Sequence, residues 1–248
     1  MGYRVGIIRY GVLVLCFWAH FAQAIVLEDL IKNSILKTTL KNKRVGYYIG
    51  SFDPLHKGHE AVVESILKQG LCDFVIIYPS WGGDSYKKRV DVSVRLDMIF
   101  SVFEKHSNVI VTRFTPKELQ EALIKNEDIL SFIGIIGSDT ALKLASDHKI
   151  SPNFMMGSKI PKKYYAHTRG GCMALPAESF IVAIRGGDSL SPLSGKLRGR
   201  KILATIESKN EQAFSSTMVK KSMQNGESIN SMVSGPVRSF IEKHDLYQ

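Results

Sequence analysis

Two histidines, His56 and His59, stand three residues apart in a short polar segment that also contains a glycine, Gly58. Imidazole rings can donate hydrogen bonds to phosphate oxygens and, when protonated, can offset the charge that builds on a leaving pyrophosphate. A glycine between them allows a ligand to approach closely. These residues indicate a phosphate site, although an isolated His-x-x-His more often belongs to a surface turn.

The elements on either side of this segment indicate how it is positioned. Residues 44–49 form an apolar run typical of a strand, and residues 61–67 carry apolar side chains with helical spacing. Residues 50–59, called the decamer below, would then form a strand-to-helix turn. The N–H groups at a helix N-terminus and the helix dipole favour an anion at that place.

The decamer reads Gly50-Ser51-Phe52-Asp53-Pro54-Leu55-His56-Lys57-Gly58-His59. It resembles the Gly-x-Phe-Asp-Pro-x-His-x-Gly-His signature of the nucleotidyltransferases related to class I aminoacyl-tRNA synthetases. A match of ten residues between an expected strand and an expected helix is far more specific than a lone Gly-x-Gly-x-x-Gly. The resemblance implies that His56 and His59 are catalytic. It also implies ATP or phosphate contacts from Gly50, Ser51, Phe52 and Gly58.

A second segment, at residues 214–220, reads Phe-Ser-Ser-Thr-Met-Val-Lys. Its hydroxyl groups can cap a helix, which is the commoner role, or can hold a phosphate together with the N–H groups of the helix. It resembles the Ile-Ser-Ser-Thr-x-Ile-Arg segment that grips ATP phosphates in this superfamily. The implied phosphate contacts are Ser215, Ser216, Thr217 and Lys220. Lysine in place of arginine keeps the charge but loses the planar bidentate fork.

Three further segments resemble the substrate side of the mononucleotide adenylyltransferases. One is Gly137-Ser138-Asp139, similar to a Gly-x-Asp segment whose aspartate accepts hydrogen bonds from ribose or base; a plain N-cap is the alternative. Another is a basic loop before a helix with an Arg-x-x-Met pattern, for which a solvated loop and a structural ion pair are the alternatives. The third is a strand that ends in arginine. The implied substrate contacts are Gly137, Asp139, Lys88, Arg95 and Arg185.

Residues 225–247 resemble the C-terminal helix pair of the bacterial nicotinate mononucleotide adenylyltransferases, so the similarity spans about residues 44–247. It implies adenylyl transfer from ATP to nicotinate or nicotinamide mononucleotide with release of pyrophosphate, in NAD biosynthesis. ATP would be a substrate, with Mg²⁺ but no dedicated protein site for it. The tryptophan that usually follows the Gly-x-Asp segment is missing, and Tyr164 or Tyr165 in the insertion, or Trp81, are candidates to supply a ring for the pyridine.

Two alternatives stay open from the sequence. Phosphopantetheine adenylyltransferases end the helix motif in lysine, as this chain does at Lys220, but they usually lack the first histidine and are shorter. An exported nucleotide-binding protein without turnover would use the same residues as a receptor site.

The composition fits a small anionic ligand. The chain has 248 residues and a formal net charge of +10, which suits nucleotide phosphates or nucleic acid. Its lysines and arginines form no basic stripe and no interleaved aromatic platform, which favours nucleotides over nucleic acid. Cys72 is expected to be buried, and nothing in the sequence supports its pairing with Cys172. No metal-ligand spacing is present, and the oligomeric state is not indicated.

The first 24 residues have the features of a secretory signal peptide. Arg4 and Arg9 precede the apolar run at 11–19, and Ala22-Gln23-Ala24 has the small-x-small form of a cleavage site. That run is too short for a stable membrane span. We expect export or secretion if this leader is real; the alternative is a cytoplasmic enzyme that starts later in the reading frame.

Strands and helices alternate after the leader. We expect an N-terminal helical extension at 25–43, with one helix over 25–40, and a nucleotidyltransferase domain at 44–248 with an insertion at about 147–177. Apolar strands at 72–78, 108–112, 129–136, 179–184 and 201–206 predict an α/β fold. Its sheet would be parallel, doubly wound and Rossmann-like, with helices on both faces and C-terminal helices. Ligands bind at the C-terminal ends of such strands, where the decamer and Asp139 both lie.

Overall fold

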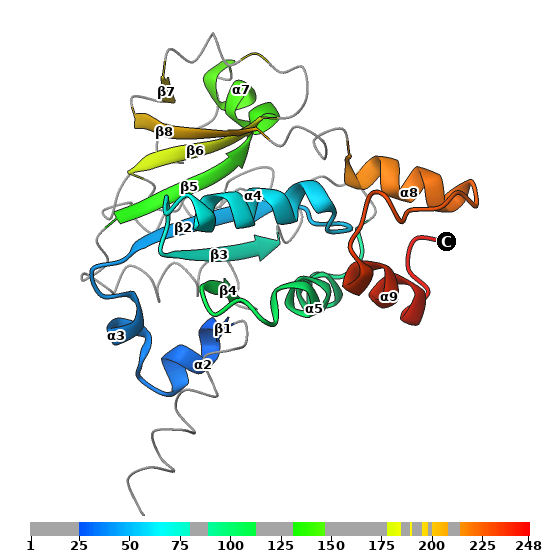
Figure 1. Ribbon diagram of the computed structural model, residues 1–248, viewed down its shortest axis with the longest axis horizontal. Coiled ribbons are helices and arrows are strands. Elements are labelled where there is room, and N and C mark those ends of the chain that lie inside the picture. The colour runs from blue at the N-terminus through cyan, green and yellow to red at the C-terminus, as the bar shows by residue number, and fades with distance from the viewer. Residues whose placement is uncertain are drawn as a thin grey trace, which may run out of the picture.

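The computed structural model of the protein describes residues 25–79, 89–112, 131–146, 178–184, 189, 195–197, 200–207 and 214–248. These residues form a sheet of eight strands in the order β1-β4-β3-β2-β5-β6-β8-β7 (Figure 1). Neighbouring strands run parallel, except for the antiparallel pair β7 and β8. The strands are β1 (Ile25–Val26), β2 (Arg44–Gly50), β3 (Phe74–Pro79), β4 (Val109–Val111), β5 (Ser131–Gly137), β6 (Ser179–Ile184), β7 (Lys196–Leu197) and β8 (Arg200–Glu207).

The central strands are buried along most of their length, as is typical of a parallel sheet covered on both faces. In β3, Val75, Ile76, Ile77 and Tyr78 are all fully buried, so side chains on both faces of the strand are covered. Strands that lie between two layers carry apolar runs instead of an alternating pattern. The predicted fold class, a Rossmann-like α/β fold, is confirmed.

Two apolar clusters cover the two faces of the sheet. The larger cluster joins one set of alternate strand residues to four helices: α4 (Lys57–Lys68), α5 (Val92–Phe103), α8 (Ser216–Gln224) and α9 (Gly235–Lys243). The smaller cluster joins the other set to α2 (Leu27–Lys32) and α3 (Leu36–Leu40). Because successive strand side chains point to opposite faces, α2 and α3 lie on the face opposite α4. A further helix, α7 (Ser138–Ser146), packs on β5 and β6.

The predicted single helix over residues 25–40 is wrong. Ile25 and Val26 pair with Ile110 and Val111 as an edge strand, and two short helices follow, separated at Ser34, whose φ is +56°. β-branched residues favour the strand, and a positive φ ends the first helix. The leucines that suggested one helix are buried in both of the short ones. Residues 25–43 therefore pack against the sheet.

Leu40→Ala tests this packing. Leu40 is fully buried in the smaller cluster, so its truncation is expected to lower the free energy of unfolding by about 2–5 kcal/mol. Thr38→Ala, an exposed change in the same helix, is expected to stay within about 0.5 kcal/mol of the wild type. Denaturant unfolding of both variants measures the difference; equal values would contradict the packing.

Some of the other expected helices are present in the structure, and other expected segments lie outside the residues that it describes. The helix expected to carry the Arg-x-x-Met pattern is α5, and the expected C-terminal helices are α8 and α9. The leader and the insertion at 147–177 lie outside the described residues. Among the helices in the described ranges, none combines the length and the apolar character that crossing a membrane requires.

The order of the strands locates a crevice. From β2 the chain proceeds outward to β3 and then β4, and it returns to β5 on the other side of β2. In open parallel sheets, ligands bind beside the carboxyl ends of the strands at the point where the strand order reverses. Here that point lies between β2, which leads into the decamer, and β5, which leads into α7.

Candidate active site

The decamer forms the expected strand-to-helix turn. β2 ends at Gly50, and α4 begins at Lys57 with His56 as its N-cap. Phe52 turns the chain inward with a φ of +45°, and its buried ring packs edge-on against Tyr48 and His59, at centroid distances of 5.2 and 4.9 Å. The Phe52 ring, predicted as a phosphate contact, therefore packs against His59 and does not line the cavity.

The two histidines stack on each other. Their ring centroids are 3.7 Å apart with an interplanar angle of 29°, and both side chains are largely buried. The backbone N–H of His56 donates to Nδ1 of His59 at 3.4 Å. A neutral His59 ring that accepts at Nδ1 carries its proton on Nε2. The start of α4 thus sets the tautomer in which Nε2 is the hydrogen-bond donor.

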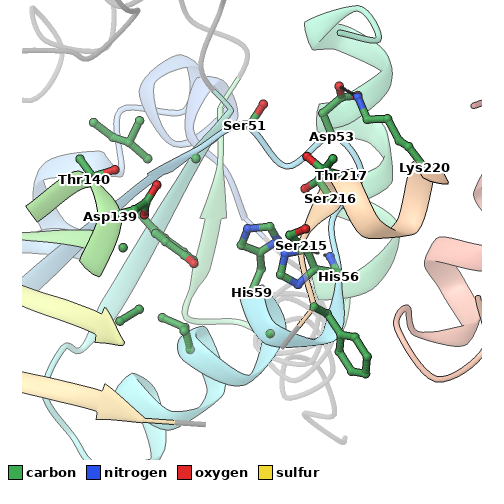
Figure 2. A pocket seen from close by; sticks show the side chains of 18 of the residues that line it. Ser51, Asp53, His56, His59, Asp139, Thr140, Ser215, Ser216, Thr217 and Lys220 are labelled. Atoms are coloured by element: carbon green, nitrogen blue, oxygen red, sulfur yellow. Dashed lines mark hydrogen bonds and ion pairs between the residues drawn. The ribbon is translucent and has the colours of Figure 1, made fainter. Parts of the chain in front are cut away.

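A cavity of about 650 Å³ lies above these rings, within the usual size range of small-molecule sites. It is lined by the end of β2, the decamer, the start of α7, the end of β6 and the start of α8. Figure 2 shows His56 and His59 side by side, Asp139 and Thr140 across from them, and Lys220 with Asp53 on the remaining side. The cavity therefore occupies the crevice between β2 and β5.

The start of α8 is fastened to the decamer. Ser215 caps the helix by accepting the Met218 N–H at 3.1 Å, and the Ser216 hydroxyl donates to the Pro54 carbonyl oxygen at 2.9 Å. Lys220, one turn later, forms an ion pair with Asp53. The N-termini of α4 and α8 consequently meet at one cavity, where their N–H groups and dipoles favour the same anion.

Asp53 joins more elements than the sequence suggested. Its side chain is 2% exposed, and its Oδ1 accepts from the Tyr247 hydroxyl at 2.8 Å and from the Val90 N–H at 3.2 Å. Its Oδ2 pairs with Lys220. Burial, followed by the charge of Asp53, raises the pKa of Tyr247, so this phenol stays protonated and donates. No single segment of sequence reveals a cluster whose members come from four parts of the chain.

Arg95, predicted as a substrate contact, lies behind the decamer. Its side chain is buried in α5, where Nε donates to the Val90 carbonyl at 2.8 Å and Nη1 to the Ser51 carbonyl at 2.6 Å. It does not line the cavity. A guanidinium that donates to two backbone carbonyls fixes the loop they belong to, because it can bond both in one plane. The structure places Arg95 as a support for Ser51, which does line the cavity.

The opposite wall is formed by the turn after β5. Gly137 and Asp139, the predicted substrate contacts, both line the cavity, and Thr140 adds a hydroxyl that the sequence did not single out. A Cβ at Gly137 would lie 2.6 Å from Oδ1 of Asp139, so the glycine makes room for the carboxylate. The one signal in the sequence that points to Thr140 is its position directly after the Gly-x-Asp segment.

The remaining predicted contacts divide into two groups. Those that line the cavity come from the decamer and α8: Gly50, Ser51, Gly58, Ser215, Ser216, Thr217 and Lys220. Lys88 and Arg185, with the candidate ring residues Trp81, Tyr164 and Tyr165, lie outside the described residues. So does Cys172, whereas Cys72 is buried and its burial raises the thiol pKa to about 12. In the described part of the chain no three His, Cys, Asp or Glu side chains gather as a metal site.

Gly50→Ala tests the support beneath the histidines. A Cβ at this position would lie 2.7 Å from the Phe52 ring, which would have to shift from its present position against His59. Small displacements of catalytic groups are costly, so turnover is expected to fall by about tenfold to a hundredfold. Gly235→Ala is the matched control, because a Cβ there meets nothing within 4 Å. Steady-state rates of both variants decide the point, and equal rates would contradict it.

Comparison with known proteins agrees with this geometry. Residues 47–222 match the family described as cytidylyltransferase-like. A relative from Dehalococcoides mccartyi, named probable nicotinate-nucleotide adenylyltransferase, is 26% identical over 210 residues, covering 82% of this chain and 97% of its own. A relative of the same name from Fusobacterium nucleatum is 25% identical over 201 residues, covering 81% and 97%. Plasmodium falciparum nicotinic acid mononucleotide adenylyltransferase complexed with NaAD shares the fold, with a TM-score of 0.58 and 17% identity, over 83% of this chain and 97% of that one.

Proposed function

The chain belongs to the cytidylyltransferase-like family, and on this premise we propose that it transfers the adenylyl group of ATP to a pyridine mononucleotide, with nicotinate mononucleotide preferred, and releases pyrophosphate. The family match and the names of the relatives support the sequence-based recognition of a nucleotidyltransferase of the nicotinate mononucleotide adenylyltransferase type. The observation that carries the proposal is the meeting of both histidines, two helix N-termini and Lys220 at one cavity.

The reaction needs no nucleophilic side chain. A phosphate oxygen of the acceptor forms a bond to the α-phosphorus of ATP, and the bond from that phosphorus to the bridging oxygen of pyrophosphate breaks. Such transfers are accelerated by positioning and by stabilising charge on the phosphoryl oxygens. In this chain His59 would donate from Nε2, while Lys220 and the N-termini of α4 and α8 would hold the phosphates.

Magnesium fits this scheme as an ion that arrives with ATP. No acidic cluster capable of holding a metal occurs among the described residues, and Asp53, which lines the cavity, is already paired with Lys220. When bound to the phosphates, Mg²⁺ would supply further neutralisation of their charge. The residues around the phosphates would then contact them through hydrogen-bond donors.

The acceptor is the finer part of the proposal. Asp139 and Thr140 stand opposite the histidines. The Asp139 carboxylate would accept hydrogen bonds from a second nucleotide, and the Thr140 hydroxyl would donate one to it. One observation favours a different acceptor, because Lys220 matches the lysine of the phosphopantetheine adenylyltransferases. The presence of His56 and the names of the relatives favour a pyridine mononucleotide.

Incubation of the purified protein with ATP and one acceptor at a time separates these possibilities. The acceptors are nicotinate mononucleotide, nicotinamide mononucleotide and phosphopantetheine, and pyrophosphate release is measured. Pyrophosphate with nicotinate mononucleotide and the matching dinucleotide product would support the proposal. Release with phosphopantetheine alone would move the assignment to that class. ATP binding without product for any acceptor would indicate a receptor without turnover.

The location of the protein is a further part of this proposal. Cleavage after Ala24, as the leader predicts, would make Ile25 the first residue of the mature chain. Ile25 already pairs with Ile110 at the sheet edge, so cleavage there would leave all described strands and helices in place. The N-terminal residue of the natural protein, determined together with cell fractionation, tests export. An N-terminus at Ile25 outside the cytoplasm supports it, and Met1 in a cytoplasmic protein contradicts it.

A further inference from the structure

The last residues of the chain reach the candidate site. After α9, Leu246 packs against the larger apolar cluster, and Tyr247 places its hydroxyl 2.8 Å from Oδ1 of Asp53. The φ of Tyr247 is +66°, a conformation that a non-glycine residue keeps only where its surroundings hold it. Tyr247 is therefore fixed in a specific place beside the decamer, and its hydroxyl donates a hydrogen bond to Asp53.

Asp53 has the geometry of a relay between the chain end and the cavity. Two donors, the Tyr247 hydroxyl and the Val90 N–H, hold its Oδ1, and its Oδ2 faces the ammonium of Lys220. A carboxylate is planar, so fixing one oxygen by two donors also fixes the direction of the other. The Tyr247 ring adds a second contact, because Nζ of Lys220 lies 5.3 Å from its centroid.

We propose that Tyr247 is a positioning residue for the binding of ATP phosphates, acting through Asp53 to hold the ammonium of Lys220 at the cavity. This inference rests on the proposed function, since it names the element that aims one phosphate-binding group of the same site. A lysine at this position needs a neighbouring group that holds its ammonium in place. Unlike the planar guanidinium, an ammonium on a flexible stem has no preferred orientation of its own and must be fixed from outside.

The mutation that tests this is Tyr247→Phe. It removes the hydroxyl but keeps the ring, so the contact with Lys220 and the apolar packing stay. Loss of one hydrogen bond to a charged group leads us to expect a KM for ATP that is raised by roughly tenfold. The KM for nicotinate mononucleotide and kcat are expected to stay within about twofold of the wild type, because the residues proposed to contact the acceptor and His59 are unchanged. Gln248→Ala, the neighbouring exposed residue, is the control.

A double-mutant cycle separates positioning from a merely structural role. With Lys220→Gln as the second change, the effect of Tyr247→Phe on the ATP KM is expected to disappear, because the group that Tyr247 positions is gone. Additive effects, an unchanged ATP KM, or equal rises in both KM values would each overturn the proposal. Thermal unfolding is recorded for each variant, and a loss of stability with unchanged ATP KM would assign Tyr247 a structural role only.

Calorimetric titration with ATP alone keeps this test separate from the test of the reaction. If the wild type binds ATP but makes no pyrophosphate, the proposed reaction fails, and the dissociation constants of wild type and Tyr247→Phe still decide the role of Tyr247. A roughly tenfold weaker binding supports positioning, on the same loss of one hydrogen bond to a charged group. Equal binding overturns it. A wild type that does not bind ATP overturns both proposals.

Discussion

Replacing His59 by alanine is expected to lower kcat by about a hundredfold to a thousandfold, the usual effect of removing one donor that stabilises transition-state charge. His59 lines the cavity, and the bond from the His56 N–H to its Nδ1 places the proton on Nε2. Alanine removes that donor. A wild-type rate in this variant would exclude His59 from the chemistry.

Two further substitutions assign the effect to a single ring atom. Asparagine places an oxygen near the position of Nδ1, so His59→Asn can still accept the His56 N–H but has no donor at the site of Nε2. Glutamine places its amide nitrogen near the position of Nε2. We therefore expect His59→Gln to regain part of the lost turnover and His59→Asn to regain none. Higher turnover in His59→Asn than in His59→Gln would mean that the His59 ring acts by accepting the N–H at the start of α4 and not by donating to the substrate.

The fold is expected to survive these changes. His59 is the third residue of α4, and its loss removes one capping interaction, which costs about 1 kcal/mol. The ring also contacts Phe52, whose other neighbours stay in place. Thermal unfolding of the three variants should show small shifts beside large changes in rate. A collapse of stability in all three would make the rates uninterpretable as chemistry.

Local patterns made the core of this site predictable. The decamer lies between an apolar strand and an amphipathic helix, and both elements are specified by residues within a few positions. The Ser-Ser-Thr segment starts α8 as predicted, because hydroxyl side chains cap helices. That both segments meet at one cavity follows from the sheet, since parallel strands deliver the loops after them to the same edge.

Long-range contacts account for what the sequence did not predict. Arg95 carries a motif that suggested substrate binding, yet its position inside α5 directs its guanidinium to the carbonyl of Ser51, a residue 44 positions earlier. The edge strand at Ile25 forms only because β4 offers a partner, which no pattern within residues 25–40 contains. Tyr247 lies in a segment for which the sequence indicated only C-terminal helices, and its bond to Asp53 spans 194 positions. Each case depends on a partner that the local sequence does not name.

Lys220→Ala is expected to affect both stability and ligand binding. Asp53 is 2% exposed and Lys220 is 28% exposed, so removal of the lysine leaves a carboxylate away from water with two neutral donors and the more distant charge of Arg95. Breaking a buried pair costs about 3–5 kcal/mol, and the partial exposure of Lys220 places this change near or below the lower limit. Denaturant unfolding measures it. ATP binding should weaken as well, because a cation that lines the cavity is lost.

The double variant Asp53→Asn with Lys220→Ala separates the two effects. Asparagine carries no charge, so the buried carboxylate that has lost its ion-pair partner disappears, and most of the lost stability should return. ATP affinity should not return, because it depends on the missing ammonium. Lys220→Arg is the complementary change: it keeps the positive charge, so both stability and ATP binding should be retained. If the double variant binds ATP as tightly as the wild type, Lys220 serves only to neutralise Asp53, and the phosphates are held by other groups that line the cavity, such as Arg89, the helix N-termini and the histidines.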